Sequence, residues 1–158
     1  MKKTVFYVNR NTNWRVRIVK RIRRPNGEPF GECEFSNPKT IRLSLNNKDT
    51  EHRIYVAIHE CLHALYDDMR EKDVSRTAKA IIRGLKKTHK KAWDKGCIKD
   101  GIGIDSKWAW SKSCRTIREC LQTLHPGIKG IDKNPAIIMR FLEHTKEFWN
   151  DKSLRKNS

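Results

Sequence analysis

The sequence predicts an α+β fold, in which a small antiparallel sheet is followed by helices. Two observations predict it. Alternating apolar and polar residues are confined to the first 48 residues, and apolar residues then recur at the three- and four-residue spacing of helices. The chain has 158 residues, of which 37% are hydrophobic and 34% charged. This length and composition suit one folded core of ordinary domain size.

Four segments carry strand signals. The run "TVFYV" (4–8) is rich in β-formers, and "WRVRIVKRIRR" (14–24) alternates with a period of two. The turn sequence "RPNGEP" follows, so we expect a hairpin whose return strand lies around residues 31–35. The alternating run "TIRLSL" (40–45) supplies the last strand.

Helices are expected from residue 49 onward. Asp49 or Thr50 can cap a first helix whose apolar face is Ile54, Ile58, Leu62 and Leu65. A second helix is expected over roughly residues 69–93, with Asp68 as its cap and Glu71 three residues later in a capping box.

Two further helices follow a glycine-rich stretch at residues 96–105, which we expect to be a loop or a short hairpin. The first carries in register Trp110, Cys114, Ile117, Leu121 and Leu124. The second opens with Asn134 as cap and Pro135 in the first turn.

These elements suggest a division of the chain into three parts. We expect residues 1–93 to form the core, residues 94–150 a basic helical extension packed on the core, and residues 151–158 a flexible tail. No repeat or low-complexity tract interrupts this order.

Composition also suggests where the protein works. No apolar stretch has the length of a signal-peptide core or of a membrane span, so no membrane partner is expected. Five cysteines at irregular spacing, without a CxxC pair, argue against a secreted disulfide framework. We therefore expect a cytoplasmic protein. Its net charge of +17 would attract polyanions such as nucleic acid.

One short segment departs from this basic character. Residues 51–73 have a net charge of −3, although both flanks are strongly basic. The segment contains "HECLH", in which His59 and His63 are four residues apart and Glu60 follows the first histidine.

This spacing has a chemical meaning on a helix. Residues i and i+4 project from the same face, so His59 and His63 can direct ring nitrogens at one metal ion. A zinc ion held by three protein ligands keeps a fourth position for water, and Glu60 is placed to take a proton from that water. The alternative is that the pattern arose by chance and that both histidines are ordinary core or surface residues.

A zinc site needs a third ligand, and the acidic segment offers two candidates. We favour Asp73, which falls in the first turn of the second helix next to the buried Val74. Glu71 is the second choice, because the capping box already gives it a role. Tyr55 and Tyr66 lie one and two turns from His59, and a packing role is expected for both.

The segment from "IRLSL" through "HECLHALYDD" to "DVSRTAKAII" resembles the zincin-type metallopeptidases, and within them the small minimal-zincin proteins of bacteria and their phages. The resemblance covers about a third of the chain. It implies that His59 and His63 bind Zn²⁺, that Glu60 is catalytic, and that the next helix brings Asp73 where the family usually has Glu. It further implies a protein of a bacterial or phage-infected cell.

The resemblance also implies a substrate-binding strand along the active-site cleft. In this chain the matching stretch is "IRLSL", which would be an edge strand on which an extended peptide substrate is laid. Its residues are Ile41, Arg42, Leu43, Ser44 and Leu45.

A basic row is expected on the second strand. Arg15, Arg17, Arg21 and Arg23 share one parity and would form a row of guanidinium groups on one face. The functional interpretation is non-specific contact with nucleic-acid phosphates. The alternative is a solvated face that keeps an edge strand from aggregating.

Two classes of function follow. The first is a zinc metalloprotease that hydrolyses a peptide bond in a specific protein substrate, which could itself be nucleic-acid-associated. The second is a basic, non-catalytic protein that keeps a zincin core and either binds nucleic acid or serves as a phage structural or interaction protein. The oligomeric state does not follow from the sequence.

Overall fold

A computed structural model of the chain describes residues 3–9, 12–36, 38–94 and 107–149. Its elements are, in chain order, β1 (Lys3–Asn9), β2 (Thr12–Val19), β3 (Gly31–Glu34), β4 (Thr40–Ser44), α1 (Thr50–Leu65), α2 (Glu71–Thr88), α3 (Lys90–Asp94), α4 (Lys107–Leu124) and α5 (Asn134–Trp149). The predicted α+β class is confirmed. The predicted loop at residues 96–105 and the tail at residues 151–158 lie outside the described residues.

The four strands form one mixed sheet in the order β1-β2-β4-β3. The pairs β1–β2 and β3–β4 are antiparallel, whereas β2 and β4 run parallel. The expectation of a purely antiparallel sheet is therefore wrong.

The expected hairpin between the second strand and residues 31–35 is wrong as well. β2 already ends at Val19, and the turn forms beyond it, between Arg24 and Gly27, which exchange two backbone hydrogen bonds of 2.9 and 3.1 Å. β3 then pairs with β4 instead of β2. This arrangement brings β2 and β4 to the middle of the sheet, where alternate side chains of both strands are buried. These central residues are Val16, Ile18, Ile41 and Leu43.

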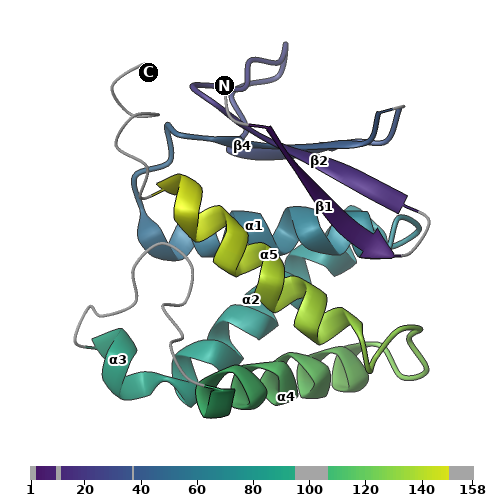
Figure 1. Cartoon of the computed structure of the whole chain (residues 1–158), viewed down its shortest axis with the longest axis vertical. Coiled ribbons are helices and arrows are strands. Elements are labelled where there is room, and N and C mark those ends of the chain that lie inside the picture. Colours follow the sequence, from purple (N-terminus) through teal and green to yellow (C-terminus); the bar gives the residue numbers. More distant parts are fainter. Residues whose placement is uncertain (1–2, 10–11, 37, 95–106, 150–158) are drawn as a thin grey trace.

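Helix α1 occupies the centre of the molecule. Its N-cap is Asp49, whose carboxylate accepts the backbone N–H of His52 at 2.8 Å, as the sequence predicts. The expected apolar face is buried at Ile54, Ile58 and Leu62. Figure 1 shows the sheet on one side of α1 and helices α2 and α4 on the other, with α5 crossing α1.

Helix α2 is shorter than the sequence suggests. It begins at Glu71, its N-cap is Arg70 without a side-chain cap bond, and Asp68 lies exposed in the preceding turn. The predicted Asp68 cap is therefore wrong. The helix ends at Thr88, and the short α3 follows after His89, whose ring Nε2 lies 2.6 Å from Ser113 Oγ on α4.

Helices α4 and α5 complete the hydrophobic core. The apolar face expected for α4 is buried at Ile117 and Leu121. Helix α5 buries Ile138 and Leu142, and these four side chains belong to the same cluster as those of α1 and α2. Residues from both halves of the chain thus share one core. Within the described part of the chain, no helix combines the length and apolar character needed to cross a membrane.

Candidate metal centre

The two histidines of "HECLH" lie on one face of α1, one turn apart. Their side chains are partly exposed, at 12% for His59 and 18% for His63, and their Nε2 atoms are 3.2 Å apart. Two imidazole nitrogens converge on one point because residues i and i+4 of a helix project in the same direction. The predicted helical context is therefore present.

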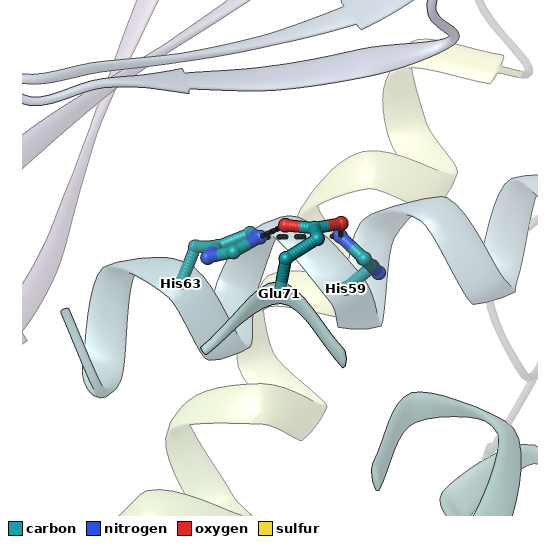
Figure 2. Close-up of side chains that lie close together, drawn as sticks. All are labelled: His59, His63 and Glu71. Atoms are coloured by element: carbon teal, nitrogen blue, oxygen red, sulfur yellow. Dashed lines mark hydrogen bonds and ion pairs between the residues drawn. The ribbon is translucent and has the colours of Figure 1, made fainter. Parts of the chain in front are cut away.

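A carboxylate from the next helix meets the two rings. Glu71 is the first residue of α2, and its Oε1 lies 2.9 Å from His59 Nε2 while its Oε2 lies 2.7 Å from His63 Nε2. Figure 2 shows the Glu71 carboxylate lying between the two imidazole rings. Among the described residues, these three side chains form the one group whose ligand atoms all lie within 4.8 Å of one another and could hold a metal ion.

The preference for Asp73 over Glu71 is not supported by this geometry. The Asp73 carboxylate accepts Arg70 Nε at 3.2 Å and lies 3.5 Å from Arg76, so it faces two guanidinium groups instead of the histidines. The reason is the late start of α2. Without an Asp68 cap, Glu71 is not held in a capping box, and its side chain reaches back to α1.

Glu60 lies buried beside the first histidine, with only 6% of its surface exposed. Burial raises its pKa to about 7, the side-chain hydrogen bond from Cys33 lowers that pKa in part, and the nearby charge of Glu71 raises it further. A carboxyl group with such a pKa exchanges a proton near neutral pH, which is what a general base or acid requires.

Two residues of β3 position Glu60, and the sequence offered no signal that they would. Gly31 packs so closely that a methyl group in place of its hydrogen would lie 2.6 Å from Val56 Cγ1 and 3.0 Å from Glu60 Cγ. Cys33 donates its thiol to the backbone carbonyl of Glu60 at 3.1 Å, and burial raises the pKa of this thiol, so it stays a donor. The contact joins residues 27 positions apart, which no local pattern reveals.

Tyr55 packs against the ring of His59 and also has a polar contact with it. Its hydroxyl lies 3.3 Å from His59 Nδ1, one turn away on α1. A bond from Nδ1–H to this hydroxyl would leave Nε2 of His59 unprotonated and available to a metal. Tyr66 lies elsewhere and accepts Asn134 Nδ2 at 2.7 Å.

The electrostatics favour a neutral imidazole at His59. Burial lowers the pKa of His59 from its ordinary value, and the negative charge of Glu71 opposes this effect in part. Because the neutral ring is the form that binds a metal, burial favours coordination near neutral pH.

The strand expected to bind substrate lies inside the sheet. The stretch 41–45 falls largely on β4, which has β2 on one side and β3 on the other. Its backbone hydrogen-bonding groups are therefore already paired, and the expectation of an edge strand at these residues is wrong. The edge strand next to α1 is β3.

The expected arginine row is shorter than predicted. Arg15 and Arg17 lie on β2 and alternate with the buried Trp14 and Val16, so they belong to the sheet face turned away from α1. Arg21 and Arg23 follow the end of β2, and Arg21 lies 3.9 Å from Glu28.

Comparison of this chain with protein-family models, with curated proteins and with solved structures found no significant match.

Proposed function

We propose that this chain is a zinc-dependent metallopeptidase, in which His59, His63 and Glu71 hold the ion and Glu60 transfers protons. The observation that carries the proposal is the convergence of three ligand atoms from α1 and α2 beside a buried glutamate whose pKa is about 7. This arrangement combines a three-ligand metal site with a proton-transfer group in one place.

The donor set fits zinc. Two nitrogens 3.2 Å apart, each about 2.0–2.1 Å from one ion, subtend about 100° at that ion, close to the tetrahedral angle. Two histidines and one glutamate leave one position of a tetrahedral ion open, as catalytic zinc sites do. Zinc in such a site polarises a substrate carbonyl and lowers the pKa of a water molecule toward about 7.

Glu60 then serves as general base and general acid. Its carboxylate accepts the proton of the attacking water, and the same oxygen donates that proton to the amine released from the peptide bond. Burial supports this role, because an ordinary exposed glutamate, with a pKa of about 4.3, would hold the proton too weakly to pass it on.

Strand β3 is the natural place for the substrate backbone. Phe30 and Ser44 form a hydrogen-bonded pair, in which Ser44 N donates to Phe30 O at 2.9 Å. Hydrogen-bonded and non-hydrogen-bonded pairs alternate along antiparallel strands, so the backbone groups of Gly31 and Cys33 point toward the free edge. An extended peptide could add to this edge as a further strand, directly above Glu60.

Metal content tests the ligand assignment. We expect purified protein to carry one zinc ion per chain, Glu71→Ala to lose it, and Asp73→Ala, the matched control, to retain it. Loss of zinc from Asp73→Ala with retention in Glu71→Ala would reverse the assignment, and absence of zinc from the unmodified protein would end the proposal.

Turnover tests the reaction itself. We expect cleavage of a peptide library by the unmodified protein and none by Glu60→Gln, with equal zinc content in both. Stoichiometric zinc without cleavage of any peptide would instead favour a protein that keeps a metal centre without turnover.

Nucleic-acid binding is a second candidate, favoured by the position of Arg15 and Arg17 on the sheet face opposite α1 together with the net charge of +17. We expect affinity for duplex DNA to fall steeply between about 50 and 200 mM salt. Arg15→Ala should weaken binding more than Arg140→Ala, an equal loss of charge on the exposed side of α5. Absent or salt-independent binding would exclude this function.

A further inference from the structure

A groove of about 520 Å³ lies between α1 and α2, beside the metal centre. Its floor includes Tyr55 and the largely buried Ile82. The residues that line it are Asp49, Glu51, His52, Tyr55, Lys79, Ile82, Arg83 and Lys86.

The groove runs away from the metal centre along an antiparallel helix pair. At one end, Glu71 of α2 meets His59 of α1 at 2.9 Å, and at the other end Lys86 meets Glu51 at 2.6 Å. Tyr55 belongs to both regions, since it lines the groove and its hydroxyl lies 3.3 Å from His59 Nδ1. A chain bound at the metal centre can therefore continue into the groove.

The charges in the groove are unequal. Glu51 forms an ion pair with Lys86, and the Asp49 carboxylate caps α1 by accepting the backbone N–H of His52. Lys79 and Arg83 are exposed on the α2 wall, one turn apart, and within the described part of the chain neither has a carboxylate partner. Two adjacent cations are thus left to meet an anion from outside.

We propose that this groove binds an acidic side chain of the peptide substrate through Lys79 and Arg83; the proposal rests on the peptidase function above and narrows its substrates. Lys79 follows Glu71 by eight residues, which is about 12 Å along a helix, or about four residues of an extended peptide. The acidic residue would therefore lie about four or five residues from the cleaved bond.

A peptide fits the groove better than a nucleic acid. The groove is lined by residues of two packed helices, its floor is partly apolar, and Tyr55 joins it to the proposed peptide-cleaving site. The guanidinium group of Arg83 can accept a carboxylate in a two-bonded geometry, and Lys79 adds a second positive charge to the same carboxylate or its neighbour.

The test measures binding separately from cleavage. Fluorescence anisotropy in the Glu60→Gln background would compare a labelled glutamate-rich peptide, a lysine-rich peptide of equal length and a single-stranded DNA oligonucleotide. The groove variant is Lys79→Glu/Arg83→Glu. The matched control is Lys87→Glu/Lys133→Glu, the same charge change at exposed positions outside the groove.

We expect the glutamate-rich peptide to bind about tenfold more weakly to the groove variant than to the control, and the lysine-rich peptide to gain affinity for the groove variant. If both variants lose the same affinity for the glutamate-rich peptide, the effect comes from the overall charge of the protein, and the proposal is overturned. If the oligonucleotide binds more tightly than the acidic peptide, and if this binding is lost in the groove variant, the groove binds phosphate and the proposal is overturned.

The proposed peptidase function is tested separately, by the zinc content and the turnover of protein in which Glu60 is intact. With a cleaved peptide in hand, moving its glutamate away from the expected position should raise KM and leave kcat unchanged. A change in kcat alone would contradict a binding role for Lys79 and Arg83.

Discussion

At the residue scale, the Tyr55 hydroxyl is the side-chain group beside Nδ1 of His59, and we expect it to orient that ring. Removing this hydroxyl in Tyr55→Phe keeps the aromatic ring but removes the partner of Nδ1 at 3.3 Å. We expect zinc affinity to fall about ten- to a hundredfold, because such partners of ligand histidines fix the tautomer and the ring direction.

Competition with a chelator of known affinity would measure the change. The matched control is Tyr66→Phe, since the Tyr66 hydroxyl bonds Asn134 away from the histidines. Equal affinities for zinc in Tyr55→Phe and the unmodified protein would show that Tyr55 only packs.

Glu60 makes the stability of the metal-free protein depend on pH. Its pKa is about 7 in the folded protein and 4.5 as the reference value, so the folded state binds the proton more tightly than the unfolded state between these values. The stability from the protonated carboxyl is present below about pH 4.5 and is lost as pH rises through about 7.

The glutamine in Glu60→Gln cannot ionise, so this variant does not lose that stability as pH rises. We expect the variant to gain stability relative to the unmodified protein as pH rises from about 5 to about 8, approaching about 3 kcal/mol. Urea denaturation after zinc removal would measure it, and the opposing effect of His59 cancels because both proteins contain it. Parallel stability profiles would contradict a raised pKa for Glu60.

At the scale of elements, the contact between β3 and α1 holds Glu60, the proposed proton-transfer residue, in place. A methyl group at residue 31 would press on Val56 and Glu60 at 2.6 and 3.0 Å. We expect Gly31→Ala to cost about 1–3 kcal/mol of unfolding free energy and to lower peptidase kcat, because relief of the clash moves either β3 or Glu60.

Gly84→Ala is the control for a steric clash that does not involve Glu60. It introduces a similar clash, 2.8 Å from Thr116 Cγ2, but between α2 and α4. We expect this variant to change stability without changing kcat. Equal effects of both substitutions on kcat would show that Gly31 has no special relation to the site.

Local signals predicted helices better than strand pairing. The start of α1 at Asp49 is confirmed because a cap and the face it opens lie within a few residues of one another. The partner of β3 depends on which strands pack on α1, a choice between segments distant in sequence. The resemblance places the edge strand at residues 41–45, whereas the sheet order puts β3 at the edge.

At the scale of the whole molecule, the second half of the chain packs against the helix that carries the candidate metal centre, through a shared core. Phe141 of α5 is fully buried in the cluster that also contains Ile58 and Leu62 of α1. We expect Phe141→Ala to cost about 3–5 kcal/mol and to lower zinc affinity as well, because the helix that carries both histidines loses packing.

Chemical denaturation followed by circular dichroism and by zinc release would measure both effects. Arg140→Ala, on the exposed side of the same helix, should change neither by much. Loss of stability in Phe141→Ala without any change in zinc binding would show that α5 folds independently of the site.

The sequence by itself determined the α+β order of elements and placed His59, Glu60 and His63 in one helix, because helical spacing is a property of the local backbone. The tertiary structure decided which carboxylate and which strand join them. Glu71 reaches the histidines and Asp73 does not because the α1–α2 turn ends later than a capping box would allow. Gly31 and Cys33 reach Glu60 because the sheet order puts β3 at the edge beside α1. Both outcomes depend on how distant segments pack together, which neither the spacing nor the alternation of residues specifies.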